Sequence, residues 1–188
     1  MRSNMRLPQT FVCALRKYQL LPSRHILSVN VAAQTMQLFQ RAKDQSRNGQ
    51  GPQFDCRKNY LISTSAYGSG QALNSHQTPL GLHRVASKVG GGQPIGTVFR
   101  SRQPVGLSWQ GLPNAPIVHR ILWLEGLEAG YNLGGSVDSF SRYIYIHGFG
   151  DETTLGRPVS EGCIHMAAKD LIPLFDVLPV GTLVWIGR

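Results

Sequence analysis

The sequence predicts a mainly β domain that contains one helix near its C-terminal end. Three observations predict this class: short segments in which apolar and polar residues alternate, the 21 glycines and 11 prolines that separate such segments, and a single apolar stripe with helical spacing. A chain of 188 residues can bury one sizeable core and is too short for two large domains. We therefore expect an N-terminal extension over residues 1–24 and one domain over residues 25–188.

The first strands follow a segment without clear periodicity. Residues 1–24 contain Pro8, Pro22 and five basic side chains, so we expect an extension that packs on the core. In residues 27–31, and again in residues 36–38, apolar and polar side chains alternate, as on a strand with one buried face. The short turn between these two segments predicts a hairpin.

The same alternation predicts the remaining strands. A polar loop over residues 41–54 precedes the third strand, and a long connection over residues 68–81 follows it. The later predicted strands cover residues 59–65, 82–87, 97–100, 117–124, 143–146 and 182–186. The domain is thus expected to contain about eight strands.

The predicted helix lies before the last strand. Its apolar residues fall at i, i+3, i+4 and i+7 within residues 171–178, which places them on one face. Asp170 is the expected N-cap, and Pro173 is tolerated in the first turn. Pro179 and Gly181 end the helix before the closing strand.

The charges and cysteines restrict the partners and the compartment only loosely. A net charge of +9 favours an anionic surface or polymer as neighbour, but the basic residues are scattered, so no nucleic-acid partner is expected. No signal peptide is visible, and no apolar run approaches the ~20 residues of a transmembrane segment. Cys13, Cys56 and Cys163 cannot all pair. Free thiols are favoured over a disulfide between Cys13 and Cys56, which stays open.

Residues 143–166 (YIYIHGFGDETTLGRPVSEGCIHM) contain the residue types that nucleophilic catalysis needs. A cysteine attacks as the thiolate, so Cys163 requires a base, and His147 at the end of an apolar strand is the best candidate. The carbonyl of Gly148 is expected to accept the other ring N–H and so to orient the imidazole. These residues together predict a nucleophile, a base and an orienting group.

The residues next to the nucleophile predict a sharp turn. Gly162 permits this turn, which would leave the Gly162 and Cys163 amides free to stabilise an oxyanion, while the Ser160 hydroxyl fixes the turn. Other interpretations stay open, since Cys163 is also consistent with a packed core thiol and His147 with a hydrogen-bonded strand end. A zinc site formed by His147, Cys163 and His165 lacks an evident fourth ligand.

This stretch resembles the L,D-transpeptidase catalytic domain family, also called YkuD-type. The family pattern is His-Gly, a loop, and Ser-x-Gly-Cys-hydrophobic-Arg-hydrophobic, and here His147-Gly148 and residues 160–166 stand in those places. Upstream, the Thr-Pro-Leu-Gly sequence of residues 78–81 is similar to the family's Thr-Pro-x-Gly element. The resemblance covers about residues 25–187.

The resemblance implies two packed mixed β-sheets with the helix beside the active site, and it implies no metal or organic cofactor. Cysteine-dependent acyl transfer on peptidoglycan stem peptides is the implied activity. The implied catalytic residues are Cys163, His147 and Gly148. Substrate contacts are implied for Ser160, Gly162, His165, Thr78 and Tyr145.

The implied reaction begins with attack of Cys163 on the third residue of a stem tetrapeptide, which releases D-alanine and leaves a thioester. Attack of an amine acceptor on the thioester then makes a 3→3 cross-link, whereas attack of water would make the protein an L,D-carboxypeptidase. Outside the enzymes, the alternative is a non-catalytic module that binds the cell wall. The implied partners are stem peptides and anionic wall polymers in the bacterial cell envelope, with the cytoplasm left open. A monomer is favoured.

Two residues depart from the family pattern. Glu161 adds negative charge beside the nucleophile and is expected to raise its pKa unless the carboxylate points away or pairs with a base such as Arg157 or Lys169. His165 replaces the family's usual Arg. One interpretation is that His165 anchors a substrate carboxylate, in which case substrate binding weakens as pH rises and the activity has a narrow pH optimum. The other is that His165 packs behind the nucleophile.

Overall fold

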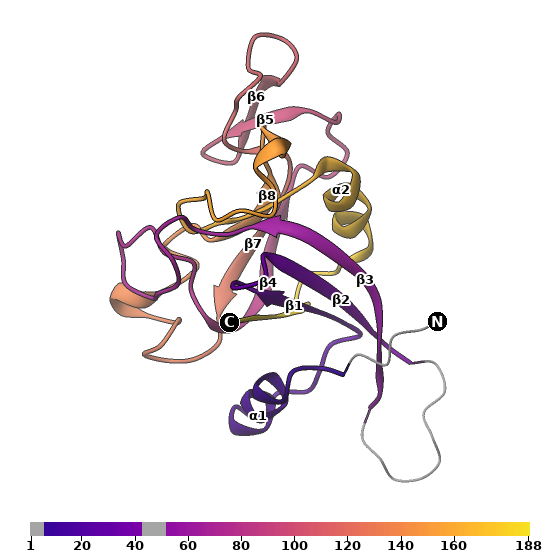
Figure 1. Ribbon diagram of the computed structural model, residues 1–188, viewed down its shortest axis with the longest axis vertical. Helices are drawn as coiled ribbons and strands as arrows, with labels where there is room; N and C mark the ends of the chain where they lie inside the picture. Colours follow the sequence, from indigo (N-terminus) through magenta and orange to yellow (C-terminus); the bar gives the residue numbers. More distant parts are fainter. Residues whose placement is uncertain (1–5, 43–51) are drawn as a thin grey trace.

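The computed structural model describes residues 6–42 and 52–188 and confirms the mainly β class (Figure 1). Its helices are α1 (Gln9–Lys17), α2 (Ala168–Val177) and the short 3-10 helices η1 (Gly135–Val137) and η2 (Glu152–Thr154). Its strands are β1 (His25–Asn30), β2 (Thr35–Arg41), β3 (Phe54–Ser63), β4 (Gly81–Val89), β5 (Thr97–Arg100), β6 (Gln103–Leu107), β7 (Val118–Gly126), β8 (Tyr145–Gly148), β9 (Ile164–Met166) and β10 (Leu183–Gly187).

All of these strands belong to one mixed sheet. They lie in the order β4-β10-β1-β2-β3-β9-β8-β7-β5-β6. β4 also pairs with β7, and this pairing closes the strands that precede β5 in this order into a ring. The pairs β1–β10 and β8–β9 are parallel, and the other pairs are antiparallel. The two packed mixed sheets that the resemblance implies are therefore joined by hydrogen bonds into one sheet.

Successive side chains of a strand point to opposite faces of the sheet, and this alternation divides the core into two parts. On β1, Leu27 belongs to the main core, which the strands share with α2. Its neighbour Ile26 belongs to a second cluster on the other face, where it packs with Phe11 and Leu15 of α1. Both faces of β1 are thus covered, one by the opposite strands and one by a helix.

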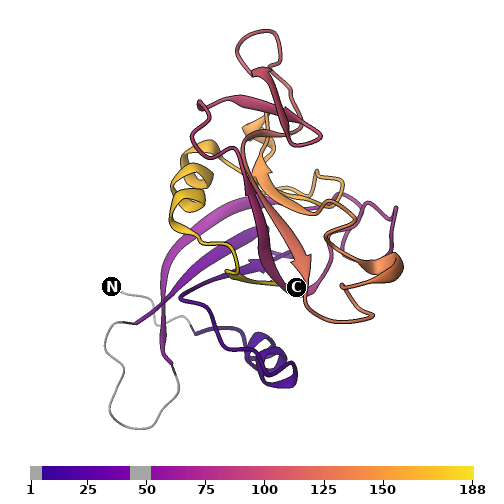
Figure 2. The same ribbon diagram turned by 180° about the vertical axis from the view of Figure 1, so that it is seen from behind.

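Helix α1 lies in the segment where no helix was expected. Its buried residues Phe11, Ala14 and Leu15 fall at i, i+3 and i+4, the spacing of one helical face. Arg16 and Lys17 occupy its last turn, where cations stabilise the helix dipole. Figures 1 and 2 show α1 and the β5–β6 hairpin at opposite ends of the molecule.

The predicted helix is present, but its predicted N-cap is wrong. Helix α2 begins at Ala168, and the N-cap position is Ala167, which offers no capping side chain. The Glu152 carboxylate instead accepts a hydrogen bond from the Ala168 amide at 2.6 Å. Asp170 lies in the first turn and forms an ion pair with Lys58 at 2.7 Å. A carboxylate from outside the helix therefore satisfies a backbone amide at the N-terminus of α2.

Two strands were not predicted, namely β6 and β9. Strand β6 contains Pro104 and Gly106, which weaken a strand pattern, and β9 has only three residues. Most of the predicted loop over residues 41–54 lies outside the described residues. Within the described part of the chain, no helix is long and apolar enough to cross a bilayer. Cys13, Cys56 and Cys163 are all free thiols.

Candidate active site

The predicted base and the predicted nucleophile come from neighbouring strands. β8 and β9 pair in parallel, with Ile146 opposite Ile164 and His147 opposite His165. Both isoleucines enter the main core, so alternation directs the two histidines to the other face of the sheet. His147 is only 2% exposed. Cys163 immediately precedes β9, and this pairing therefore brings it to the strand that carries His147.

The sulfur of Cys163 contacts the beginning of β8. Its Sγ atom accepts a hydrogen bond from the Tyr145 amide at 3.4 Å, and the thiol donates to the Tyr143 carbonyl at 3.4 Å. Among the described residues, the imidazole of His147 is not a hydrogen-bond partner of Sγ. In this arrangement the thiol proton is directed to the Tyr143 carbonyl.

Burial keeps both groups uncharged. It raises the pKa of the Cys163 thiol to about 11, although the Tyr145 amide and the positive charge of Arg142 act in the opposite direction. Burial also lowers the pKa of His147 to about 4, against the raising effect of the Gly148 carbonyl. The resting pair at neutral pH is thus a thiol and a neutral imidazole. The sulfur loses its proton only as a base accepts it.

The predicted contact between Gly148 and the imidazole is confirmed. The Nδ1 atom of His147 lies 2.8 Å from the Gly148 carbonyl oxygen. Because a carbonyl only accepts hydrogen bonds, Nδ1 carries the proton, and Nε2 is left as the basic atom. A Cβ atom at position 148 would lie 2.5 Å from the His119 ring and 2.6 Å from the Val118 carbonyl oxygen, so this close approach requires glycine.

The predicted sharp turn is present at Gly162, whose φ is +117°. The Ser160 hydroxyl fixes it, as expected, by donating to the Cys163 carbonyl at 2.6 Å. The same hydroxyl accepts from the Gly162 amide at 3.2 Å, so the expectation of a free Gly162 amide is wrong.

The connection between β3 and β4 packs against this turn. Thr78 is fully buried, and its Oγ1 accepts from the Ser65 amide at 3.0 Å, so it holds the connection together. A Cβ atom at Gly162 would lie 3.2 Å from the Gln77 carbonyl oxygen. The backbone of the residue before Thr78 therefore lies close to the turn at Gly162.

Arg142 was missed by the sequence reasoning. Its guanidinium donates to the carbonyl oxygens of Gly70 at 3.2 Å, Gln71 at 2.8 Å and Gln77 at 2.6 Å. It thereby fixes the β3–β4 connection, and its charge also favours the thiolate of Cys163. An isolated arginine between two predicted strands belongs to no motif, so the sequence offered no signal for it.

His165 lies behind the site as a packed side chain. It is 6% exposed and stacks on Phe149, with ring centroids 4.4 Å apart and planes inclined by 11°. Its ring also meets His147 edge-on at 4.9 Å. Burial, together with His147, lowers the pKa of His165 to about 3. Of the two interpretations, this geometry favours packing over the anchoring of a carboxylate.

Glu161 points into solvent. Its carboxylate lies 3.6 Å from Nδ1 of His76, and neither Arg157 nor Lys169 is its partner. Burial is the cause of the raised pKa of Cys163, and Glu161 does not contribute to it. Glu161 thus meets the condition under which no effect on the nucleophile was expected, although its partner is His76 in place of Arg157 or Lys169.

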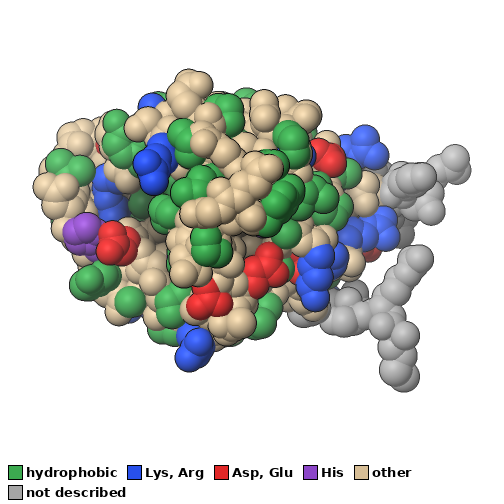
Figure 3. Space-filling view, turned by 90° about the horizontal axis from the view of Figure 1, so that it is seen from above, with side chains coloured by type: hydrophobic (Ala, Val, Ile, Leu, Met, Phe, Trp, Pro, Cys, Tyr) green, Lys and Arg blue, Asp and Glu red, His purple; other side chains and the backbone are tan. Residues whose placement is uncertain are grey.

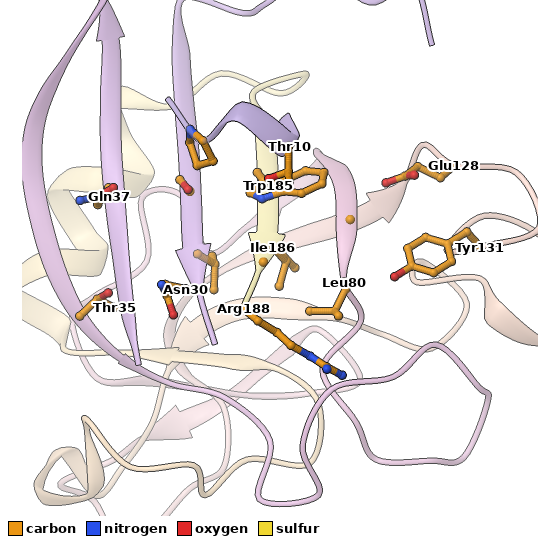
Figure 4. Close-up of a pocket in the computed structure, with 15 residues that line it drawn as sticks. Thr10, Asn30, Thr35, Gln37, Leu80, Glu128, Tyr131, Trp185, Ile186 and Arg188 are labelled. Carbon is orange, nitrogen blue, oxygen red and sulfur yellow. The ribbon is translucent and has the colours of Figure 1, made fainter. Parts of the chain in front are cut away.

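The predicted catalytic residues form no cluster of metal ligands within the described part of the chain, and the cavity beside α1 lies apart from them. Within the described residues, no group of three or more His, Cys, Asp and Glu side chains converges as metal ligands would. A cavity of about 700 Å³ lies between α1, β1, β2 and β10, where Trp185, Tyr131 and Glu128 point toward it (Figure 4). None of the predicted site residues lines this cavity.

Comparisons with known proteins agree with the resemblance read from the sequence. A family model described as the L,D-transpeptidase catalytic domain, YkuD, matches residues 24–186. The YkuD protein of Bacillus subtilis (strain 168) is 45% identical over 51 residues, which are 27% of this chain and 31% of that protein.

One solved structure shares the fold, and a second aligns with a lower TM-score. Bd1075 of Bdellovibrio bacteriovorus aligns with a TM-score of 0.54 at 14% identity, over 100% of this chain and 53% of that chain. An L,D-transpeptidase from Mycobacterium smegmatis aligns with a TM-score of 0.47 at 14% identity, over 88% of this chain and 59% of that one. The chain thus spans less than two thirds of the length of each of these relatives.

Proposed function

Because the chain belongs to the L,D-transpeptidase catalytic domain family, we propose that it transfers acyl groups of peptidoglycan stem peptides through a thioester on Cys163. One observation supports this most strongly: Cys163 precedes the strand that pairs with β8, and β8 carries an imidazole whose Nδ1 is held by the Gly148 carbonyl. This arrangement supplies a nucleophile, a base and an orienting group. We assign the activity to residues 25–188.

The first half of the reaction acylates the enzyme. Sγ of Cys163 attacks the carbonyl carbon of the third stem residue while its proton passes to Nε2 of His147, because both groups are neutral at rest. The Cys163 amide stabilises the tetrahedral oxyanion. The C–N bond to D-alanine then breaks, and the departing amine takes the proton from His147. The product is a thioester and free D-alanine.

The second half regenerates the thiol. The side-chain amine of another stem attacks the thioester carbon and forms a 3→3 cross-link, while His147 passes the proton of the amine to the departing sulfur. Attack by water gives a tripeptide instead, which is L,D-carboxypeptidase activity. Ser160 and Gly162 shape the turn that receives the donor, Thr78 fixes the adjoining connection, and Tyr145 supplies backbone next to Sγ.

The proposed setting follows from the substrate. Peptidoglycan lies in the bacterial cell envelope, so we place the protein there, acting as a monomer. A net charge of +9 suits anionic wall polymers as neighbours.

Product analysis tests the proposal. The chain is incubated with a stem tetrapeptide, with and without an amine acceptor, and D-alanine, tripeptide and cross-linked dimer are measured by mass spectrometry. We expect release of D-alanine by the native protein and by Cys56→Ala, a control that removes a distant thiol, and no release by Cys163→Ala. Dimer without tripeptide identifies a transpeptidase, and tripeptide alone identifies a carboxypeptidase. No release of D-alanine by the folded native protein contradicts the proposal.

A further inference from the structure

The hairpin of β5 and β6 turns at two residues with unusual backbone angles. Arg100 pairs with Gln103, and the two residues between them, Ser101 and Arg102, have φ values of +47° and +67°. Two-residue hairpin turns of this kind favour Asn and Gly, because other residues clash in the left-handed region. Tyr143, which faces this turn, also has a positive φ, +57°. Non-glycine residues keep such backbone angles only where the surrounding structure holds them.

The turn carries the side chain of Arg102 onto an aromatic surface. Its guanidinium carbon lies 4.7 Å from the ring centroid of Trp123 and 5.3 Å from that of Tyr143. Its Nη1 donates to the Tyr145 hydroxyl at 3.3 Å. Trp123 in turn stacks on Phe140, with centroids 3.9 Å apart and planes inclined by 4°. The aromatic rings therefore hold the cation in place while its other N–H groups stay available.

Arg102 has no acidic partner in the described part of the chain. The ion pairs found there are made by four other basic residues, Arg57, Lys58, His76 and Arg84. Figure 3 views the molecule from the end that carries this hairpin and shows hydrophobic side chains interspersed with separate charged groups. The guanidinium group of Arg102 is held in place, is permanently charged and has no carboxylate partner among the described residues. Its planar set of N–H donors suits the binding of a carboxylate ligand.

The same residues that hold Arg102 also contact the reacting sulfur. The Tyr145 amide and the Tyr143 carbonyl are the hydrogen-bond partners of Sγ of Cys163, and their rings support the guanidinium. The other nearby basic residues are unsuited to bind a substrate anion. Arg142 already donates to several carbonyl oxygens, and His165 is buried and neutral.

We propose that Arg102 binds a carboxylate of the peptide donor that acylates Cys163. This inference rests on the proposed function and names the feature of the substrate that the site recognises. Where the third residue is a diacidic diamine, the donor offers two such groups, the side-chain carboxylate of that residue and the C-terminal carboxylate of D-alanine. The guanidinium fork suits either one, and paired donor peptides distinguish them.

The test uses three tetrapeptide donors: one with both carboxylates free, one amidated at the third residue and one amidated at the C-terminus. The values of kcat and KM are measured for the native protein, Arg102→Gln, Arg102→Lys and Arg100→Gln. Arg100 is an exposed residue of the same hairpin, so its replacement controls for the loss of one positive charge. Melting temperatures confirm that each variant is folded.

We expect Arg102→Gln to lower kcat/KM for the free donor on the order of 10- to 100-fold, mainly through KM. Arg102→Gln should show no such loss with the donor in which an amide replaces the recognised carboxylate. With the free donor, the loss should be smaller in Arg102→Lys and absent in Arg100→Gln. Equal losses with all three donors, or no loss with any, overturn the inference. A folded native protein that releases neither D-alanine nor, from the donor amidated at the C-terminus, D-alanine amide contradicts the proposed function itself.

Discussion

Residue-level chemistry at Cys163 and His147 leads to a prediction about pH. The pKa of His147 is lowered to about 4 and that of Cys163 is raised to about 11, so neither group titrates in between. We therefore expect kcat/KM for D-alanine release to change less than about threefold from pH 5.5 to 9, because neither ionisation limits the rate there. This differs from the narrow optimum expected if His165 titrated. Steady-state assays across this range check it, and a limb with an apparent pKa between 6 and 8 would show a thiolate and imidazolium pair instead.

Substitution of His165 separates packing from binding. Its Nδ1 is buried and has no hydrogen-bond partner among the described residues, and its ring stacks on Phe149. His165→Phe should change the free energy of unfolding by less than about 1 kcal/mol, since an apolar ring replaces an unpaired polar one. His165→Arg should lower it by about 3 kcal/mol or more, because a charge would be buried without a partner.

Urea unfolding measures both His165 variants. An Arg variant as stable as the native protein, with a lower KM above pH 7, supports the anchoring of a substrate carboxylate and contradicts packing.

The sequence could indicate those residues whose proposed chemical roles require a particular side chain. A cysteine nucleophile needs a base and a sharp turn, so Cys163, His147 and Gly162 could be selected, and the contact to the Gly148 carbonyl followed from the need to orient a ring. Arg142 could not be selected, because its role depends on carbonyl groups more than sixty residues away in sequence. Such contacts are set by the fold and leave no local pattern.

At the scale of elements, the connection between β3 and β4 packs against the turn at Gly162. The Thr78 hydroxyl accepts from the Ser65 amide, and both groups are buried. Thr78→Val would leave that amide unsatisfied and should lower the free energy of unfolding by about 1–3 kcal/mol. The shape of the pH profile should stay unchanged, because this hydroxyl takes part in no proton transfer. A new limb in the profile of the variant would place Thr78 in the chemistry.

The elements differed in how well local sequence predicted them. Helix α2 and the long strands have periodic apolar residues, so they could be predicted from spacing. Strand β9 has three residues and exists through its pairing with β3 and β8, which no local pattern records. Helix α1 buries three residues of its nine, and the basic residues beside them obscured the apolar face. The order of the strands depends equally on distant pairing, as between β1 and β10.

For the whole molecule, buried histidines predict sensitivity to acid. Burial lowers the pKa of His83 and His147 to about 4 and that of His165 to about 3. Unfolding restores values near 6.5, so the unfolded chain binds more protons below that pH, and stability falls as pH decreases. We expect a loss on the order of 1–2 kcal/mol per histidine between pH 7 and pH 5.

Urea unfolding at a series of pH values checks this expectation. His165→Phe, which removes one of the three groups, should show a smaller loss between pH 7 and pH 5 than the native protein. A stability that does not change between these pH values would mean that the histidines are charged or exposed in the folded state.

The most direct test of the central claim, that Cys163 is the acylated nucleophile, is the intact mass of the protein after reaction with a carbapenem. The β-lactam ring opens on the attacking thiol without losing a fragment, so the acyl group stays on the residue that attacked. We predict one adduct, mapped by peptide analysis to Cys163, with Cys13 and Cys56 unmodified, and no adduct in Cys163→Ala. An adduct that persists in Cys163→Ala, or its absence from the folded native protein, would contradict the account.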